Sequence, residues 1–239
     1  MPRRLLTLTR LLALGLLLLP GVPASAQGGS PAQLSGSVFK LFGQVGGTPA
    51  TPVSPTPASP TPVNLDALKF RPSAEVRQRA IAAFLNTVDE QSPEVGAEFQ
   101  KVFASTDFFA GLEGQARALF GLSTSNLADT WALYWAYSWL LSQGRSDDPT
   151  RAQVAGLRAQ MGALMLKLPE VRAYSEARRQ EISDTLMLQL TLYSVLSEGW
   201  KDDPASLKEF GQGIARSSRT LGLDLNQVTL TPQGFVPRK

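Results

Sequence analysis

Hydrophobic residues recur at helical intervals through most of the chain between residues 65 and 225. Two stretches, 126–143 and 182–196, are apolar on nearly every side. That pattern is typical of helices enclosed by neighbours on several sides. We therefore expect these two helices to form the inner pair of a helical bundle.

Amphipathic helices are expected around this pair. Residues 150–168 place their apolar side chains on one stripe, which predicts an outer helix, and 205–221 is its counterpart. The residues opposite the stripe of 150–168 are polar: Gln153, Gln160 and Lys167. Three earlier helices are expected to start at Ser73, Ser92 and Asp107, although Gly111 and Gly114 weaken the third.

Two predicted turns share a sequence. Residues 141–149 and 196–204 have Leu, Ser, Gly, Asp, Asp and Pro in common at a spacing of 55. Gly144 and Gly199 are suited to end a helix in the left-handed conformation, and Asp148 and Asp203 to cap the next one. The same turn would thus join an inner helix to an outer one twice, by duplication or by convergence on good turn chemistry.

The predicted fold is an all-α bundle of about six helices, built around two similar helical hairpins. It spans residues 64–225. Residues 226–239 form a C-terminal tail with apolar side chains at Val228, Leu230 and Phe235. We expect this tail to lie against the bundle.

A proline-rich linker precedes the predicted bundle. Residues 48–63 contain six prolines among threonine, serine and alanine, which favours a disordered, extended spacer. At about 3.1 Å per residue it would span roughly 50 Å. Before it lies a short Gly-rich segment, 27–47, whose apolar residues are few and include Val38, Phe39, Leu41, Phe42 and Val45.

The first 26 residues have the pattern of a signal peptide. Arg3 and Arg4 precede an apolar run over 5–19, and Ala24-Ser25-Ala26 offers a cleavage site. The alternative is a membrane anchor, but a spanning helix needs roughly 20 apolar residues. We therefore expect export to the periplasm, the cell envelope or the medium, with no transmembrane helix after cleavage.

Charge and composition narrow the possible functions. The chain has 23 basic and 20 acidic residues, and three of the basic ones lie in the leader, so the exported part is close to neutral. This balance gives no reason to expect a nucleic-acid partner. With no histidine and no cysteine, a Ser-His-Asp triad, a thiolate nucleophile, a disulfide and a histidine-containing zinc site are excluded. No cofactor and no metal are expected.

One group of residues is a candidate ligand site. Trp131, Trp135 and Trp139 recur every four residues, and Asp129 and Gln189 are polar positions on apolar helices. Aromatic stripes can line a groove for a sugar or peptide, but the same spacing is also typical of a packed core. Asp129 and Gln189 are likewise either hydrogen-bonded structural residues or members of a site.

The paired aspartates of the two turns are a weaker candidate. Asp147-Asp148 and Asp202-Asp203 offer oxygen ligands for calcium, but they lack the interleaved spacing of a calcium loop. Helix capping is the favoured interpretation.

Four stretches carry a resemblance to a known family: 126–141 with its Asn-Leu-Ala-Asp start, Leu168-Pro169-Glu170-Val171-Arg172 and its continuation to 180, Leu221-Gly222-Leu223-Asp224, and the close Leu230-Thr231-Pro232-Gln233-Gly234. The chain over residues 65–235 resembles a family of predicted-secreted bacterial helical proteins classed as a domain of unknown function. The resemblance implies an all-helical fold and export, and it supplies no activity.

The sequence thus favours an exported noncatalytic domain that binds or supports other components of the cell envelope. The rival hypothesis is a histidine-free envelope hydrolase that pairs Glu198 with Asp184 or Asp129. A third has Phe39 and Phe42 contact a membrane or partner, although so few apolar residues are insufficient for stable insertion. The partner would be an envelope protein or a small ligand, and the sequence does not identify it further.

Overall fold

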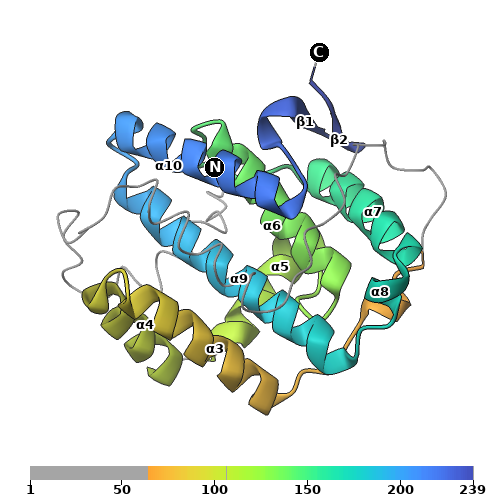
Figure 1. Cartoon of the computed structure of the whole chain (residues 1–239), viewed down its shortest axis with the longest axis horizontal. Helices are drawn as coiled ribbons and strands as arrows, with labels where there is room; N and C mark the ends of the chain where they lie inside the picture. The colour runs from red at the N-terminus through yellow and green to blue at the C-terminus, as the bar shows by residue number, and fades with distance from the viewer. Residues whose placement is uncertain (1–63, 106, 239) are drawn as a thin grey trace, which may run out of the picture.

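The computed structural model describes residues 64–105 and 107–238 (Figure 1). This part of the chain forms eight α-helices, three 3₁₀ helices and one two-stranded sheet. The α-helices are α3 (Ala74–Asp89), α4 (Pro93–Ser105), α5 (Phe108–Phe120), α6 (Leu127–Ser142), α7 (Arg151–Lys167), α8 (Pro169–Arg172), α9 (Glu176–Gly199) and α10 (Pro204–Ser218). The 3₁₀ helices are η1 (Asp66–Leu68), η2 (Arg219–Leu221) and η3 (Leu225–Gln227), and the strands are β1 (Val228–Thr231) and β2 (Gly234–Pro237).

The helix starts follow from short polar side chains. Each of six helices begins after a residue whose side chain accepts a hydrogen bond from a backbone N–H of the first turn: Ser73, Asp107, Asn126, Thr150, Ser175 and Asp203. These bonds satisfy donors that have no partner inside the helix. At α7, Thr150 and Gln153 form a complete capping box.

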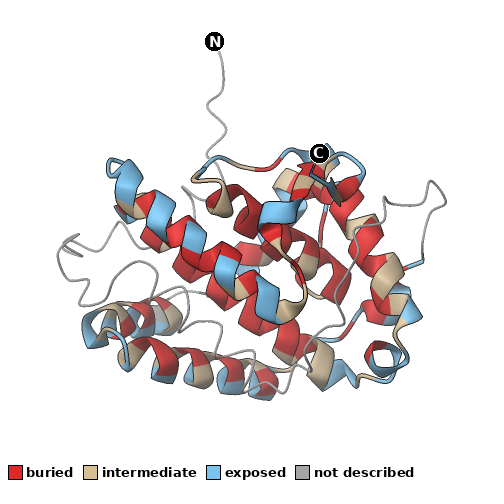
Figure 2. Ribbon diagram, turned by 45° about the horizontal axis from the view of Figure 1, so that its top comes forward, coloured by how far each residue is buried: buried red, intermediate tan, exposed pale blue. Residues whose placement is uncertain are grey.

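The two helices α6 and α9 form the centre of the bundle (Figure 2). Every residue from 127 to 141 except Trp131 is buried, and so is every residue from 182 to 194. The pair runs in the same direction, because Thr130 contacts Ser183 near their N-terminal ends and Leu141 and Ser197 line one pocket near their C-terminal ends. The predicted inner pair is confirmed, although α9 begins six residues earlier than the pattern predicted.

The remaining helices surround this pair. In Figure 1, α9 lies between α10 on one side and α3 on the other. α10 crosses α6 so closely that a side chain at Gly211 would meet the carbonyl oxygen of Leu141 at 2.1 Å. α3 packs on α9, α4 packs on α3, and α7 packs on α6. The structure confirms the all-α bundle and the α6–α7 hairpin, whereas α10, which follows α9, packs mainly on α6.

The predicted C-terminal tail is a β-hairpin. β1 and β2 pair antiparallel, with Leu230 opposite Phe235 and Thr231 opposite Gly234. Leu230 and Phe235 are buried, and both strands pack against α7. Residues 228–231 of β1 do alternate apolar and polar side chains, a short signal that the prediction of a tail did not use.

The two similar turns differ in structure. Gly144 has a φ of 70°, the left-handed conformation that ends α6, as predicted. The same prediction for Gly199 is wrong, because Gly199 is the last helical residue of α9. Asp203 caps α10, but Thr150 rather than Asp148 caps α7, so the second helix starts later after the first turn.

The segments predicted as leader (1–26), Gly-rich segment (27–47) and spacer (48–63) lie outside the described residues. Within the described part, no helix combines the length and the apolar character that crossing a membrane requires.

Candidate functional site

The aromatic stripe lies mainly inside the bundle. Trp135 is 1% exposed and Trp139 is 6% exposed, whereas Trp131 is half-buried. Trp139 donates its indole N–H to the carbonyl oxygen of Val228, 3.0 Å away, and so connects α6 to β1. Trp131 stacks beside Trp135 with ring centroids 6.0 Å apart. Among the five predicted site residues, Trp131 is the one that is not buried.

Gln189 lies in a polar cluster in the centre of the bundle. Its Nε2 donates to the hydroxyl of Tyr193 at 3.1 Å, while its Oε1 has no hydrogen-bond partner within the described residues. The rings of Tyr193 and Tyr134 lie 6.3 Å apart between α9 and α6. Burial raises the pKa of both tyrosine hydroxyls well above their usual value, so they remain neutral.

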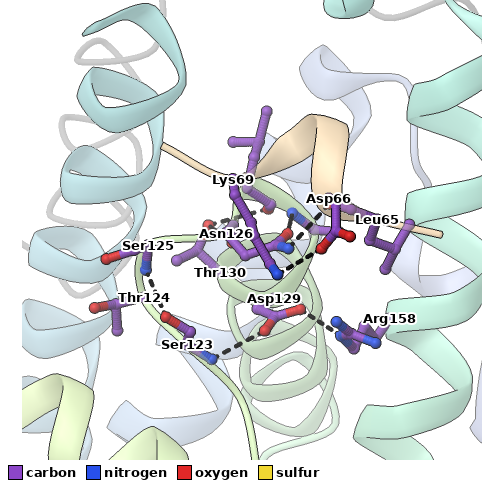
Figure 3. A network of polar contacts seen from close by, with 12 residues as sticks. Leu65, Asp66, Lys69, Ser123, Thr124, Ser125, Asn126, Asp129, Thr130 and Arg158 are labelled. Atoms are coloured by element: carbon purple, nitrogen blue, oxygen red, sulfur yellow. Dashed lines mark hydrogen bonds and ion pairs between the residues drawn. The ribbon is translucent and has the colours of Figure 1, made fainter. Parts of the chain in front are cut away.

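Asp129 belongs to a second polar network, at the N-terminal end of α6 (Figure 3). One carboxylate oxygen pairs with Nε of Arg158 on α7, and the other accepts the backbone N–H of Ser123 at 2.9 Å. Asp129 is 3% exposed, so its carboxylate has lost most of its hydration. The free-energy cost of that loss is offset because both carboxylate oxygens have partners. The network ties α6 to α7 and to the loop before it.

That loop is fixed from its other side by Glu113 of α5. Its Oε2 accepts the hydroxyl of Thr124 at 2.8 Å and that of Ser123 at 3.3 Å. Burial acts to raise the pKa of Glu113, but the hydrogen bonds from Thr124, Arg117 and Ser123 outweigh it and hold the pKa below its usual value.

Residues 64–73, which we call the strap, lie across the same region (Figure 3). Asn126 donates its side-chain N–H to the carbonyl oxygen of Leu65, and Phe70 donates its backbone N–H to Ser125. From α9, Nη1 of Arg179 donates to the carbonyl oxygens of Ala67 and Lys69 at 2.7 and 2.6 Å. The strap is thereby fastened to α6 and α9.

Asp184 is the buried carboxylate where α3 meets α9. It is 2% exposed, accepts a hydrogen bond from Nε2 of Gln180 at 3.0 Å, and has Nε of Arg77 at 3.7 Å. The guanidinium of Arg77 lies over the ring of Phe109, 4.1 Å from its centre. Burial raises the pKa of Asp184 to about 6, and Gln180 and Arg77 offset part of that rise.

Gln180 also holds the end of the strap. Its Oε1 accepts the backbone N–H of Ser73 at 2.7 Å, and its Nε2 donates to the carbonyl oxygen of the same residue at 2.8 Å. Ser73 is the N-cap of α3, so one side chain of α9 fixes both the cap and the buried carboxylate.

The structure brings Asp129 and Asp184 into one region but keeps Glu198 away. Thr130 and Ser183, the neighbours of the two aspartates, share a hydrogen bond of 3.0 Å. Glu198 follows Asp184 by 14 residues on α9 and pairs with Lys201 at 2.7 Å. At 1.5 Å per residue, Glu198 and Asp184 are separated by roughly 21 Å along the helix.

The aspartates of the two turns have local roles. Asp147 pairs with Arg145, Asp148 accepts the hydroxyl of Tyr137 at 2.7 Å, and Asp203 caps α10. No group of three or more acidic residues placed to hold a metal occurs among the described residues. A pocket under the first turn, lined by Tyr137, Leu190 and Ser194 among others, has room for about one water molecule.

Sequence reasoning missed three polar residues that join elements of the fold. Gln160 was placed opposite the apolar stripe of its helix, yet it is 8% exposed, because the C-terminal hairpin covers that face of α7. Arg77 and Gln180 gave no signal, since their partners are defined by contacts between α3 and α9. The one signal in the sequence was the presence of polar residues next to apolar, buried positions of the same helix.

A comparison with protein-family models identifies the family of this chain. The model of a family of unknown function (DUF6683) matches residues 38–238. The chain belongs to this family. No curated protein matches the chain, and no solved structure does.

The DUF6683 match confirms the predicted kinship with a family of unknown function and extends it beyond residues 65–235. It includes the Leu230-Thr231-Pro232-Gln233-Gly234 close, which is the turn of the hairpin, where Gly234 has a φ of 91°. Such a conformation favours glycine. The bacterial and secreted character of the family remains a prediction.

Proposed function

We propose that this chain is an exported, noncatalytic helical domain that serves as a binding or structural component of the cell envelope. The observation that carries the noncatalytic part is the enclosure of α6 and α9, whose polar side chains are used to join helices. Export is supported by the leader pattern of residues 1–26.

The carboxylates that the rival hydrolase would need are far apart or engaged by other residues of the fold, which supports the noncatalytic proposal. Glycosidases need two carboxyl groups roughly 5 to 10 Å apart that both face the substrate. Glu198 is roughly 21 Å along α9 from Asp184, and Asp129 is engaged by Arg158 and Ser123. These groups bind elements of the fold to one another.

The proline-rich stretch supports a tethered role. Residues 48–63 follow the Gly-rich segment and connect directly to the strap, which α6 and α9 hold. A proline-rich linker keeps the segments that it joins apart. The helical domain would therefore act at a distance from whatever residues 27–47 contact.

The first test is fractionation of cells that express the full chain. We expect a product beginning at Gln27 in the envelope or periplasmic fraction, as shown by its N-terminal sequence. The matched control replaces Arg3 and Arg4 by Asn, which weakens the cationic start and should retain the unprocessed chain inside the cell. A wild-type chain that stays unprocessed in the cytoplasm would contradict export.

The hydrolase remains a second candidate because of one observation. A carboxyl group with a pKa of about 6 beside an arginine suits a general acid near neutral pH, and Asp184 has this environment. The test is release of reducing ends from purified cell-wall polysaccharide by the wild type and Asp184→Asn. Release by the wild type that Asp184→Asn abolishes would support the hydrolase, and no release by either would support the noncatalytic proposal.

A further inference from the structure

The fastening of α3 to α9 is concentrated at one end of their interface. α3 and α9 run in the same direction, since Ser73 contacts Gln180 and Arg77 contacts Asp184 one turn further along. These polar contacts lie at the N-terminal end of α3, and beyond them the interface is apolar, with Ala80, Phe84 and Leu188 buried. α4 packs on α3, so both helices depend on this interface.

Asp184 has Arg77 as its counter-charge in the closed interface, but the ion pair is a long one. Its distance of 3.7 Å from Nε of Arg77 exceeds a hydrogen bond, and that Nε makes no hydrogen bond to any described residue. Gln180 donates a hydrogen bond from its Nε2 to the carboxylate of Asp184 at 3.0 Å. An ionised carboxylate in this place is therefore poorly compensated for the water that it has lost.

The other charged groups on the surrounding elements are engaged elsewhere. On α9, Glu181 pairs with Arg178; on α6, Asp129 pairs with Arg158; and on α5, Glu113 binds Thr124 and Arg117. From α5 the residue at the interface is Phe109, which contacts Arg77. Arg77 is thus the charged group that acts on Asp184.

We propose that Asp184 is a proton-dependent latch, which holds the α3–α4 pair on α9 when it is protonated and loosens that pair when it ionises. Protonation removes a buried charge that Arg77 and Gln180 compensate only in part, while Gln180 keeps the N-cap of α3 in place. When α3 moves away, water reaches the carboxylate and ionisation becomes favourable. Acid pH therefore stabilises the closed interface, and neutral pH stabilises the open one.

The sign and size of the effect follow from linkage. Asp184 has a pKa of about 6 in the closed interface against an ordinary value of 3.8 in water. The equilibrium constant for opening should then rise about tenfold between about pH 5 and pH 8, provided that opening exposes Asp184 fully. This is a conformational device of the bundle, and it is independent of whether the chain is exported or catalytic.

Amide hydrogen exchange of the full chain tests the latch. Exchange of the α3 amides, corrected for the intrinsic effect of pH, should report an opening constant about tenfold larger at pH 8 than at pH 5. Asp184→Asn should abolish this pH dependence, because asparagine keeps the hydrogen-bonding shape and does not ionise. The matched control is Asp129→Asn, which removes a different buried carboxylate, the one that pairs with Arg158 of α7. It should leave the pH dependence of α3 intact.

A second measurement keeps the test decisive if a variant fails to fold. The carboxyl carbon resonance of Asp184 in the wild-type chain should titrate with a midpoint near 6. A midpoint near 4, opening of α3 that is independent of pH, or opening that increases in acid would each overturn the proposal.

Discussion

Gln160 of α7 forms two hydrogen bonds with the backbone of one residue, Phe235 of β2. Its Oε1 accepts the N–H of Phe235 and its Nε2 donates to the carbonyl oxygen, both at 2.8 Å. The side-chain amide thus takes the place of a neighbouring strand at the edge of the hairpin. Gln180 binds the backbone of Ser73 in the same two-point manner at the other end of the described chain.

Gln160→Ala should lower the free energy of unfolding by about 2–4 kcal/mol, because it leaves a buried N–H and a buried carbonyl without partners. Chemical denaturation at fixed pH measures the change. The control is Gln212→Ala on the exposed face of α10, which should change stability by less than about 0.5 kcal/mol. Equal effects from both substitutions would show that the two-point contact does not fasten the hairpin.

Two glycine-to-alanine substitutions should have opposite signs. At Gly156 of α7 a Cβ would lie 2.1 Å from the carbonyl oxygen of Pro232, so alanine must displace the hairpin turn, at about 1–3 kcal/mol. At Gly111 of α5 the same atom meets nothing within 4 Å, and alanine should stabilise the helix by about 0.5–1 kcal/mol. Thermal unfolding of both variants decides the point. A stabilised Gly156→Ala would contradict the close contact.

The tryptophans should differ when each is changed to phenylalanine. Trp139→Phe removes the hydrogen bond to Val228 and should cost about 1–3 kcal/mol, since a buried carbonyl is left unpaired. Trp131→Phe removes an indole N–H that has no partner among the described residues, so we expect a smaller loss. Denaturant midpoints compare the two. A larger loss at Trp131 would indicate that its ring carries packing that half-burial understates.

Asp184 should give the fold an acid-favoured contribution to stability. Its folded pKa of about 6 is raised above the unfolded value, so the contribution is complete below the unfolded pKa and is lost as the pH rises through 6. Between about pH 7.5 and pH 4.5 the difference should be about 2 kcal/mol. The difference in unfolding free energy between wild type and Asp184→Asn, followed over this range, isolates it from other carboxylates.

Glu113 contributes with the opposite sign, and so the comparison with Asp184→Asn is required. Its folded pKa is lowered, hence its stabilisation is present above its unfolded pKa and disappears as the pH falls through the folded value. Total stability should therefore decline again in strong acid. A wild-type curve that declines steadily from pH 7.5 downward, with Asp184→Asn parallel to it, would rule out the assigned role of Asp184.

The two related turns offer a further comparison. Gly144→Ala places a side chain at a φ of 70° and should cost about 1 kcal/mol, as expected for the left-handed region. Gly199→Ala adds a side chain to the last helical residue of α9 and should change stability by less than about 0.5 kcal/mol. Unfolding curves of the two variants test this. Equal costs would indicate that both glycines need the same conformation.

Local signals in the sequence were sufficient to predict the longer helices, although the four-residue α8 and the first six residues of α9 were not expected. The caps Ser73, Asp107 and Asp203 act within one turn, and the apolar faces of α6 and α9 are complete in themselves. The hairpin and the polar contacts depend on partners far along the chain, such as Arg77 and Asp184, which are 107 residues apart. Nothing in the spacing of residues within one helix specifies such a pair.

The candidate site shows the same division. Polar residues on apolar helices pointed to Asp129 and Gln189, and both are indeed buried among hydrogen-bond partners. The spacing of the tryptophans did not decide between a packed core and a ligand groove, because a helix would present the same residues to either. Ligand binding by Trp131, Trp135 and Trp139 stays a prediction that the substitutions above begin to address.

The strap determines how the bundle would carry mechanical load. Tension applied through the chain before residue 64 reaches Leu65 first, which lies against Gly162 of α7 and is held by Asn126 at the start of α6. It then reaches Arg179 of α9, and only afterwards the start of α3 at Ser73. The applied force is therefore divided among α6, α7 and α9, and no single contact of the strap has to resist all of it.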